Sequence, residues 1–498
     1  YEEHGFPDDA VKHALQAQDF EKAAALIERA ARGSMLDGRL TTLLHWVDAL
    51  PDASLRARPR LRFYQAWALH LGGKSETAEQ ILRDARQDVQ ALPSSPDNLT
   101  LQGELAALLT SIATLHEEPS IVIQEAQEAL TYLPEKDLVS RARVNVALGT
   151  AYAYSDETGE ATRTFNHARD LALEAGNPFL AAAAIELLAG MQIYHQGCLR
   201  EGARTLQQVL DMGSAEGGTR LPFTATAHVL LAEVYLERND LDAAADLLNR
   251  GIELLQQGGI GYSLTHTHCV QARLRQALGD RSGAVDALRK ASQASKTYPM
   301  LHFVVHQAAC QVRLALWLGD IEAASRWAWG DPHKVGRTLP ENLALYLREV
   351  LQVSQARVFL ALGETAKVLG MFHRLYGPAR AAGRNARIVE IFLLKALALQ
   401  VQGDTIAARQ ALEQPLSLAQ QEGHVRVFLE EGEPMAVLLR AAAANGIEPD
   451  YANDLLAAFG QPAADKRQLS RAPHVSSAPP PAPLAEPLTQ RELEVLRL

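Results

Sequence analysis

The sequence has few of the features that mark disulfide-rich, zinc-ribbon or membrane proteins. Its 498 residues include only three cysteines, Cys198, Cys269 and Cys310, with no C-x-x-C pair among them. An odd, scattered set of this kind fits neither a disulfide framework nor a zinc ribbon and suits a reducing cytosol. The apolar stretch 180–188 contains Glu186 and is too short to cross a bilayer, and no basic-then-apolar leader is present. We therefore expect a cytoplasmic protein without membrane contact.

Aromatic residues and clustered positive charge are also scarce. Aromatic residues make up 6% of the chain against 47% hydrophobic residues overall, and Ala, Leu and Gln are abundant, which favours helix over strand. The formal net charge of -11 argues against DNA binding by this part of the chain, because affinity for phosphates comes mainly from clustered Lys and Arg. The composition predicts an all-α fold.

A two-residue step recurs along the chain, in which a residue suited to a left-handed turn mostly precedes an acidic residue. The steps are Gln18-Asp19, Gly73-Lys74, Asp156-Glu157, Gly197-Cys198, Asn239-Asp240, Gly279-Asp280, Gly319-Asp320, Gly363-Glu364 and Gly403-Asp404. From residue 197 onward they lie 42, 40, 40, 44 and 40 residues apart. The first residue would end one helix and the second would cap the next, so each step predicts the turn of a helix pair.

The residues after each step predict how the two helices pack. A small residue follows five positions after each step, except after Gly363, where Val368 stands instead. A larger apolar residue follows four positions after that, except after Gly319, where Ala328 stands instead. The small residue lets the helices approach, and the larger one fills the seam a turn later on the same face. Such units bury their faces only by stacking. We therefore predict an all-α, TPR-like superhelix with a period of about 40 residues, longer than the usual 34.

The pattern also suggests the domain boundaries. Residues 1–35 are expected to be leading helices and 36–460 the superhelical domain, which is less regular at its N-terminal end, with a degenerate unit near Glu118-Pro119. Residues 461–487 are rich in Pro, Ala and Ser, which predicts an extended linker. Residues 488–498 have the pattern of a helix start, since Thr489 and Glu492 can form a capping box.

The residue types of this last segment add a resemblance. They resemble the opening of the LuxR-type helix-turn-helix at Leu488, Thr489, Arg491, Glu492, Glu494, Val495 and Leu496. The opening residues 1–7 and the stretch with Gly423, Arg426, Phe428, Leu429, Gly432, Pro434 and Met435 are similar to segments of MalT-like, large ATP-binding LuxR-family transcriptional regulators. The resemblance implies an inducer-binding superhelix between an N-terminal ATPase module and a C-terminal DNA-binding domain. It implies no cofactor in this chain and ATP in the missing N-terminal module.

A ligand would be expected on the inner surface of the superhelix, which the first helix of each pair lines. Two residues before the step the residue types vary in a way that a packed core does not explain, with Tyr154, His195 and Glu237 in three successive units. We predict that these three residues form a ligand-binding stripe. The alternative is an ordinary solvated edge.

A cluster of possible metal ligands has a less specific pattern. His302, His306 and Cys310 lie four residues apart on one helical face, and His266 occupies the equivalent place to His306 in the preceding unit. No glutamate of an H-E-x-x-H motif follows His302, so we interpret these residues as packing or hydrogen-bonded side chains and expect no metal. No catalytic triad or carboxylate pair can be picked out, and we expect no enzymatic activity in this chain.

These observations lead to one functional hypothesis and one alternative. The hypothesis is the signal-sensing and oligomerisation region of an ATP-dependent LuxR-family regulator. Its partners would be an inducer, either a small molecule or a regulatory protein, promoter DNA through the mostly absent helix-turn-helix, and possible further copies of itself. The alternative is a TPR-like scaffold that docks partner proteins and has no transcriptional role.

Overall fold

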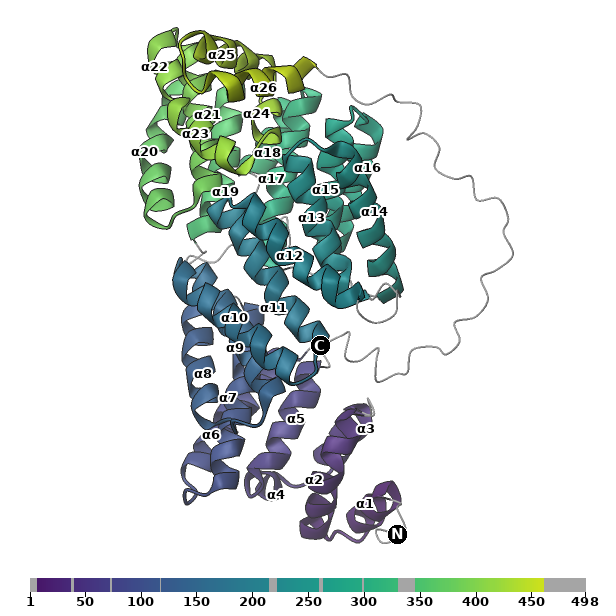
Figure 1. The fold of residues 1–498 in the computed structure, drawn as a ribbon. Helices are drawn as coiled ribbons and strands as arrows, with labels where there is room; N and C mark the ends of the chain where they lie inside the picture. The colour runs from purple at the N-terminus through teal and green to yellow at the C-terminus, as the bar shows by residue number, and fades with distance from the viewer. Residues whose placement is uncertain are drawn as a thin grey trace, which may run out of the picture. The chain divides into compact units, whose positions relative to one another are not determined.

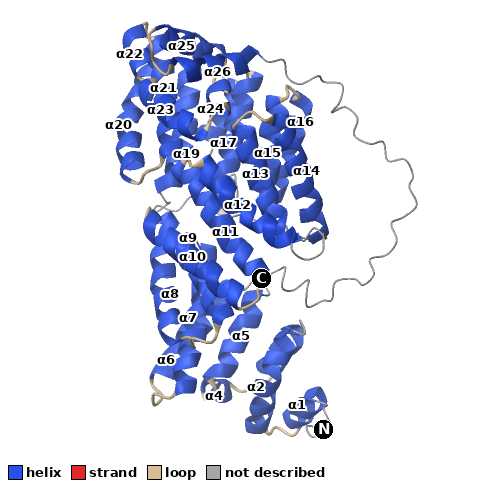
Figure 2. Ribbon diagram, viewed as in Figure 1, coloured by secondary structure: helices blue, strands red, loops and turns tan. Residues whose placement is uncertain are grey.

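The computed structural model describes residues 7–36, 40–71, 74–116, 118–214, 222–258, 263–297, 300–329 and 345–460. Every regular element in these ranges is a helix, so the predicted all-α fold is confirmed (Figures 1 and 2). No helix in the ranges is long and apolar enough to cross a membrane. The expected linker and the helix-turn-helix residues from Leu488 to Leu498 lie outside the described residues.

The chain divides into two compact units. The described part of unit 1 lies within residues 1–152 and 163–181, and that of unit 2 within 153–162 and 182–460. Unit 1 contains α1 (Pro7–Gln16), α2 (Phe20–Leu36), α3 (Leu40–Asp48), α4 (Asp52–Arg56), α5 (Pro59–Leu71), α6 (Ser75–Gln90), α7 (Pro96–His116) and α8 (Pro119–Tyr132). Residues of α9 (Leu138–Tyr154), α10 (Thr158–Glu174) and α11 (Pro178–Met191) belong to both units.

Unit 2 continues with a π-helical turn and a long series of helix pairs. Its elements are η2 (Gln192–Gln196), α12 (Leu199–Ser214), the short 3-10 helix η3 (Pro222–Thr224), α13 (Ala225–Glu237), α14 (Leu241–Gly258), α15 (Leu264–Ala277), α16 (Arg281–Thr297), α17 (Leu301–Leu318), α18 (Ile321–Trp329), α19 (Leu345–Ala361), α20 (Thr365–Ala381), α21 (Asn385–Val401), α22 (Thr405–Gln410), α23 (Glu413–Glu422), α24 (Arg426–Leu429), α25 (Glu433–Ala444) and α26 (Pro449–Gly460).

The recurring step forms the predicted turn. Its first residue is left-handed in every described unit, with φ between 57° and 84° at Gln18, Asp156, Gly197, Asn239, Gly279, Gly319, Gly363 and Gly403. At Gly279, for example, the Asp280 amide donates to the Arg275 carbonyl at 2.9 Å and closes α15. The Asp280 carboxylate accepts from the Gly283 amide at 2.9 Å and caps α16. One short sequence therefore ends a helix and starts the next one.

The packing within and between pairs follows the predicted register. The small residue after the step is buried at Ala23, Ala78, Ala161, Ala244, Ala284, Ala324 and Ala408, and the larger residues Leu248, Leu288 and Leu412 fill the seams. Helices of a pair pack on each other, and the first helices α13, α15, α17, α19 and α21 also contact each other in succession. The apolar residues of each pair thus contact the neighbouring pairs as well. This stacking confirms the predicted TPR-like helical-repeat fold.

Candidate functional site

Three consecutive helix pairs of unit 2 place an arginine at the same position. Arg273 on α15, Arg313 on α17 and Arg357 on α19 each precede the left-handed glycine of their pair by six residues. Their side chains are 18%, 22% and 7% exposed, respectively. Removing a guanidinium from water costs several kcal/mol unless carboxylates and hydrogen bonds compensate. These three residues, hereafter the arginine ladder, therefore need acidic partners.

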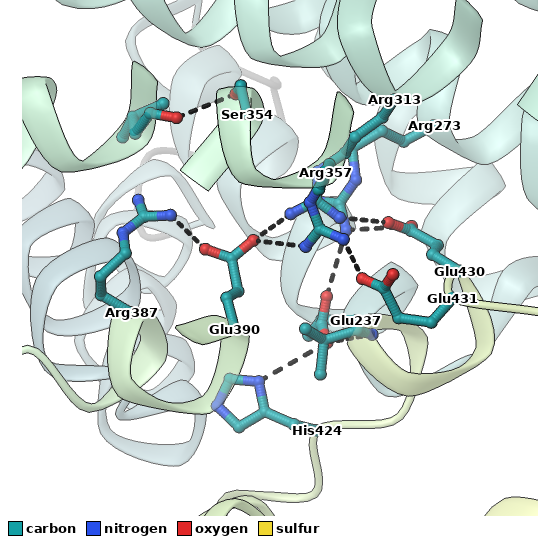
Figure 3. A network of polar contacts seen from close by, with 12 residues as sticks. Glu237, Arg273, Arg313, Ser354, Arg357, Arg387, Glu390, His424, Glu430 and Glu431 are labelled. Atoms are coloured by element: carbon teal, nitrogen blue, oxygen red, sulfur yellow. Dashed lines mark hydrogen bonds and ion pairs between the residues drawn. The ribbon is translucent and has the colours of Figure 1, made fainter. Parts of the chain in front are cut away.

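The acidic partners come from elements on both sides of the ladder in the sequence. Glu430 accepts from Arg313 at 2.9 Å and from Arg273 at 3.2 Å, and Glu431 pairs with Arg357. Two further carboxylates, Glu233 and Glu237 at the end of α13, both bind Arg273. Glu390 on α21 binds Arg313, Arg357 and Arg387 (Figure 3). The ladder is thus enclosed by carboxylates of α13, α21 and the residues after α24.

The charges of this network stabilise each other. Burial alone would raise the pKa of Glu430, but Arg273, Arg313, Arg426 and Arg357 lower it to about 2. The pKa of Glu390 likewise falls well below its ordinary value, because Arg387, Arg313 and Arg357 outweigh the effect of burial. Glu430 and Glu390 are therefore charged at neutral pH. In a low-dielectric interior, removing one member leaves an uncompensated charge, which is costly.

Residues 422–431, hereafter the clasp segment, also tie the last helices of unit 2 to its first ones. The Val425 amide donates to the Glu237 carbonyl at 2.9 Å, and the Val427 amide donates to the Glu237 carboxylate at 3.0 Å. Nε2 of His424 lies 2.9 Å from the Gly197 carbonyl, and the Glu422 carboxylate accepts from the Arg200 amide at 2.9 Å. Because α13 and η2 lie more than 180 residues before these partners, the clasp segment closes a long loop of chain.

His424 adds a contact with a carboxylate to this closure. Burial disfavours the imidazolium, but the neighbouring Glu237 carboxylate outweighs burial, and the pKa of His424 is raised above its ordinary value. The two groups lie 3.6 Å apart. The Tyr451 hydroxyl donates to the His424 carbonyl, which anchors α26 to the same point.

A cluster of aromatic and histidine rings adjoins the arginine ladder. It consists of Tyr154, Tyr194, His195, His266, His302, Phe303, His306 and Tyr346, whose neighbouring ring centroids lie 3.8–6.5 Å apart. This set is hereafter the ring cluster. Glu233 joins it to the ladder, because the carboxylate binds Arg273 and also accepts from the Tyr194 hydroxyl and from His266. Unit 2 therefore places rings and charges side by side.

Three histidines of the ring cluster are uncharged at neutral pH. Burial lowers the pKa of His195 and of His302 to about 3 each and that of His306 to about 4, and neighbouring positive groups add to the effect. Glu233 behaves in the opposite way: burial would raise its pKa, but His266 and Arg273 lower it to about 2. The ring cluster therefore offers neutral imidazoles next to a fixed carboxylate.

The structure brings two of the three predicted stripe residues together and holds the third elsewhere. Tyr154 and His195 both contact Tyr346, at ring centroid distances of 5.5 and 4.4 Å. Glu237 instead binds Arg273 and the clasp segment. His195 and Glu237 are 7% and 8% exposed, so the alternative of a solvated edge does not hold for these two residues. That the three residues bind a ligand stays a prediction.

The possible metal ligands named from the sequence have other partners. Nδ1 of His302 lies 3.3 Å from the Tyr154 hydroxyl, and His266 contacts Glu233 and Tyr194. Cys310 packs against the apolar cluster that contains Cys269 of α15. Within the described ranges no group of three or more His, Cys, Asp or Glu is arranged to hold a metal ion.

The arginine ladder was not among the predicted site residues, although the sequence contains a signal for it. Arg273, Arg313 and Arg357 are spaced 40 and 44 residues apart, the same intervals as the steps at 279, 319 and 363. A charged residue at one register of three successive units is unusual for a helix that is buried on several sides. For Glu430 and Glu431 the sequence holds no comparable signal, because they lie outside the repeated pattern.

Comparison with known proteins places the chain in a family. The family described as the MalT-like TPR region matches residues 103–445, and a tetratricopeptide repeat matches residues 59–84. The protein named HTH-type transcriptional regulator MalT of Cronobacter sakazakii is 26% identical over 549 residues, covering 99% of this chain and 55% of that protein. The protein of the same name from Serratia proteamaculans is 24% identical and covers 99% of this chain and 55% of that protein. The chain thus spans about half the length of these curated relatives.

Solved structures of helical-repeat proteins show a more distant likeness. A Rap protein complexed with competence and sporulation factor covers 77% of this chain and 99% of its own at 12% identity and a TM-score of 0.48. The apo form of RapI covers 59% of this chain and 98% of its own at 10% identity and a TM-score of 0.45. The family match spans most of the chain, and it agrees with the helical repeats described above. The chain belongs to the family of MalT-like TPR regions.

Proposed function

We propose that this chain is the signal-sensing region of a MalT-like transcriptional regulator and that an inducer binds unit 2 at the ring cluster. The observation that carries the proposal is the ring cluster itself. It gathers eight rings in a chain with few aromatic residues, and it adjoins a buried network of ion pairs. Apolar rings together with a few fixed polar groups are the side chains that typically line ligand sites.

A buried polar atom without a partner supports the same location. Nδ1 of His195 has no hydrogen-bond partner among the described residues, and His195 is 7% exposed. An unsatisfied buried donor or acceptor costs about 1–3 kcal/mol, which a ligand that bonds to it recovers. The inducer would be a small molecule or a regulatory protein segment that reaches this atom.

The proposed mechanism is a shift between two arrangements of the full-length regulator. An inducer acts only through a difference in its affinity for the two arrangements. The clasp segment is a suitable element to respond, because it contacts the ladder, α13 and η2 and is followed by the C-terminal part of the chain. Residues 461–487 would give a DNA-binding domain reach, and self-association would raise its effective concentration at a promoter.

The outer modules of this proposal come from the resemblance and from the relatives. The relatives are named HTH-type transcriptional regulators, which favours a transcriptional role over a plain docking scaffold. ATP would bind in an N-terminal module, and promoter DNA would bind through a helix-turn-helix that begins at Leu488. No enzymatic role is proposed for the helical repeats of this chain.

A thermal-shift screen of sugars and other small metabolites on this chain tests the proposal, because a ligand that binds only the folded state raises its apparent stability. Tyr154→Ala, His195→Ala and Glu237→Ala are expected to reduce the shift caused by a hit compound. His373→Ala on the exposed side of α20 serves as the matched control. Full binding by all three variants would refute the site, and a screen without hits would favour a protein inducer.

A further inference from the structure

An early and a late part of unit 2 meet through hydrogen bonds. Each bond joins a residue of the clasp segment to a residue between Gly197 and Asn239. These contacts are hereafter the polar seam: Glu422 with Arg200, His424 with Gly197, Val425 and Val427 with Glu237, and Arg426 with Asn239. His424 also faces the Glu237 carboxylate (Figure 3). The polar seam therefore consists of groups to which water can also hydrogen-bond.

The apolar clusters on the two sides of the polar seam are separate. On one side, Phe428 is fully buried in a cluster that runs from Val353 to Leu455. On the other side, the cluster of α13 runs from Ala225 to Leu278. Among the described residues, neither cluster has a member on the other side. Water replaces lost hydrogen bonds at a small net cost, whereas exposing apolar surface is unfavourable. The polar seam can therefore part without dividing either of these clusters.

The ring cluster adjoins the polar seam at His195, which precedes Gly197 by two residues. The ring of His195 lies 4.4 Å from that of Tyr346, and its Nδ1 is buried without a partner among the described residues. The backbone is equally close here, because a Cβ atom on Gly197 would lie only 2.8 Å from the Ala386 amide nitrogen. A solute can thus reach Nδ1 of His195 only after the surrounding chain moves.

We propose that the polar seam opens reversibly and is the entrance to the ring cluster. When it opens, the hydrogen bonds to Gly197 and Glu237 pass to water, and the two apolar clusters stay intact. The chain around Gly197 then moves away from Ala386, and His195 becomes accessible. A molecule that binds beside His195 would favour one of the two states. This last step rests on the proposed function, whereas the opening itself does not.

Hydrogen–deuterium exchange of the full 498-residue chain, resolved to single amides, tests the opening. The Val425 and Val427 amides are the reporters, because both donate across the polar seam to Glu237. We expect them to exchange together and faster than the helical amides of α13 and α25, because local opening frees them while these helices stay folded. Protection of both amides as strong as that of the helices would overturn the proposal.

The substitution His424→Leu weakens the polar seam while keeping a side chain of similar size. Leucine cannot donate to the Gly197 carbonyl or bind the Glu237 carboxylate. Exchange at Val425 and Val427 should therefore rise roughly five- to tenfold, the factor that corresponds to about one hydrogen bond. His424→Gln is the matched control, because glutamine can still donate to this carbonyl, and its exchange should stay close to that of the wild type. Equal exchange in both variants would contradict the role of this bond.

Diethyl pyrocarbonate, which modifies uncharged imidazoles, measures access to the ring cluster. His195 is uncharged at neutral pH, because burial lowers its pKa to about 3. Its labelling, mapped by mass spectrometry, should rise in His424→Leu by the same factor as exchange at Val425. Labelling of His373 on the exposed side of α20 should not change.

Two outcomes of this labelling would overturn the entrance. One is faster exchange at the polar seam without faster labelling of His195. The other is an equal rise at His195 and His373, which would indicate general unfolding. No inducer is needed for these measurements, so their failure is distinct from a failure of the proposed function. Far-UV circular dichroism checks that each variant is folded.

Discussion

The substitution Glu430→Gln tests whether the buried charge network stabilises unit 2. Glu430 bridges two helix pairs, because one carboxylate oxygen binds Arg273 at 3.2 Å and the other binds Arg313 at 2.9 Å. Its side chain is 5% exposed. Glutamine keeps the size of the side chain but removes the charge that compensates the two guanidinium groups. The variant therefore isolates the electrostatic part of the contact.

The pKa of Glu430 gives the expected magnitude. A carboxyl whose pKa falls from 4.5 in the unfolded chain to about 2 in the folded one stabilises the fold by about 3 kcal/mol at neutral pH. This agrees with the ~3–5 kcal/mol lost when one partner of a buried ion pair is removed. This contribution to the free energy of unfolding is present above pH 4.5 and is lost as the pH falls through 2. At about pH 3, less than half of it remains.

Equilibrium urea unfolding at pH 7 and pH 3, followed by far-UV circular dichroism, measures both quantities. Glu433→Gln is the control, because Glu433 pairs with Arg440 at 3.0 Å but both side chains are mostly exposed. Exposed pairs contribute about 0–1 kcal/mol. Each loss of unfolding free energy is measured relative to the wild type at the same pH. The reasoning is wrong if Glu430→Gln loses no more than the control variant at pH 7. It is also wrong if Glu430→Gln loses as much at pH 3 as at pH 7.

Further predictions concern two buried titratable groups and one close helix contact. Burial raises the pKa of Glu186 to about 8, which the Ala227 amide offsets only in part, so stability is lost as the pH rises from 4.5 to 8. Glu186→Gln should therefore melt higher than the wild type at pH 8.5 but not at pH 4.5, and equal melting at both would contradict this. Burial lowers the pKa of His302 from 6.5 to about 3, so the folded state loses stability as the pH falls below 6.5. His302→Gln should lose less stability than the wild type between pH 7 and 4 in urea titrations. Gly197 and Gly279 both have φ 74°, but a Cβ atom would lie 2.8 Å from the Ala386 amide nitrogen at Gly197 and would contact nothing at Gly279. Gly279→Ala should cost roughly 1–2 kcal/mol for the left-handed backbone. Gly197→Ala should cost clearly more, and the melting temperatures of the two variants measure the difference. Similar losses would show that α21 does not approach η2 this closely.

The repeat architecture could be predicted from the sequence because its signals are local. A left-handed residue followed by a capping carboxylate, as at Gly279-Asp280, needs only its own neighbours to form a turn. Where a small residue stands five positions later, it is buried, for example at Ala284 and Ala324. Each unit repeats the same local interactions, so the same step predicts the helices of several units.

The site could be predicted only in part. His195 and Glu237 were selected because their residue types vary between units, yet the structure separates them into the ring cluster and the clasp segment. Tyr346, which joins Tyr154 to His195, was not identified, because it lies four helix pairs beyond His195 and its contacts depend on how the superhelix turns. The direction of each first helix is a sum of many small packing angles, which sequence spacing does not give.

Local patterns in the chain specify the helices, their turns and the contacts between paired helices, because contacts between residues up to about 20 positions apart depend on periodicity and capping. The same repeat puts Arg273, Arg313 and Arg357 in one register. Which carboxylates neutralise them depends on the folding of the whole unit. Glu430 lies 157 residues from Arg273 and 117 from Arg313. No local preference selects such partners: they meet because the stacked helix pairs bring the clasp segment back to α13, and because a buried arginine without a carboxylate would cost more than the fold can sustain.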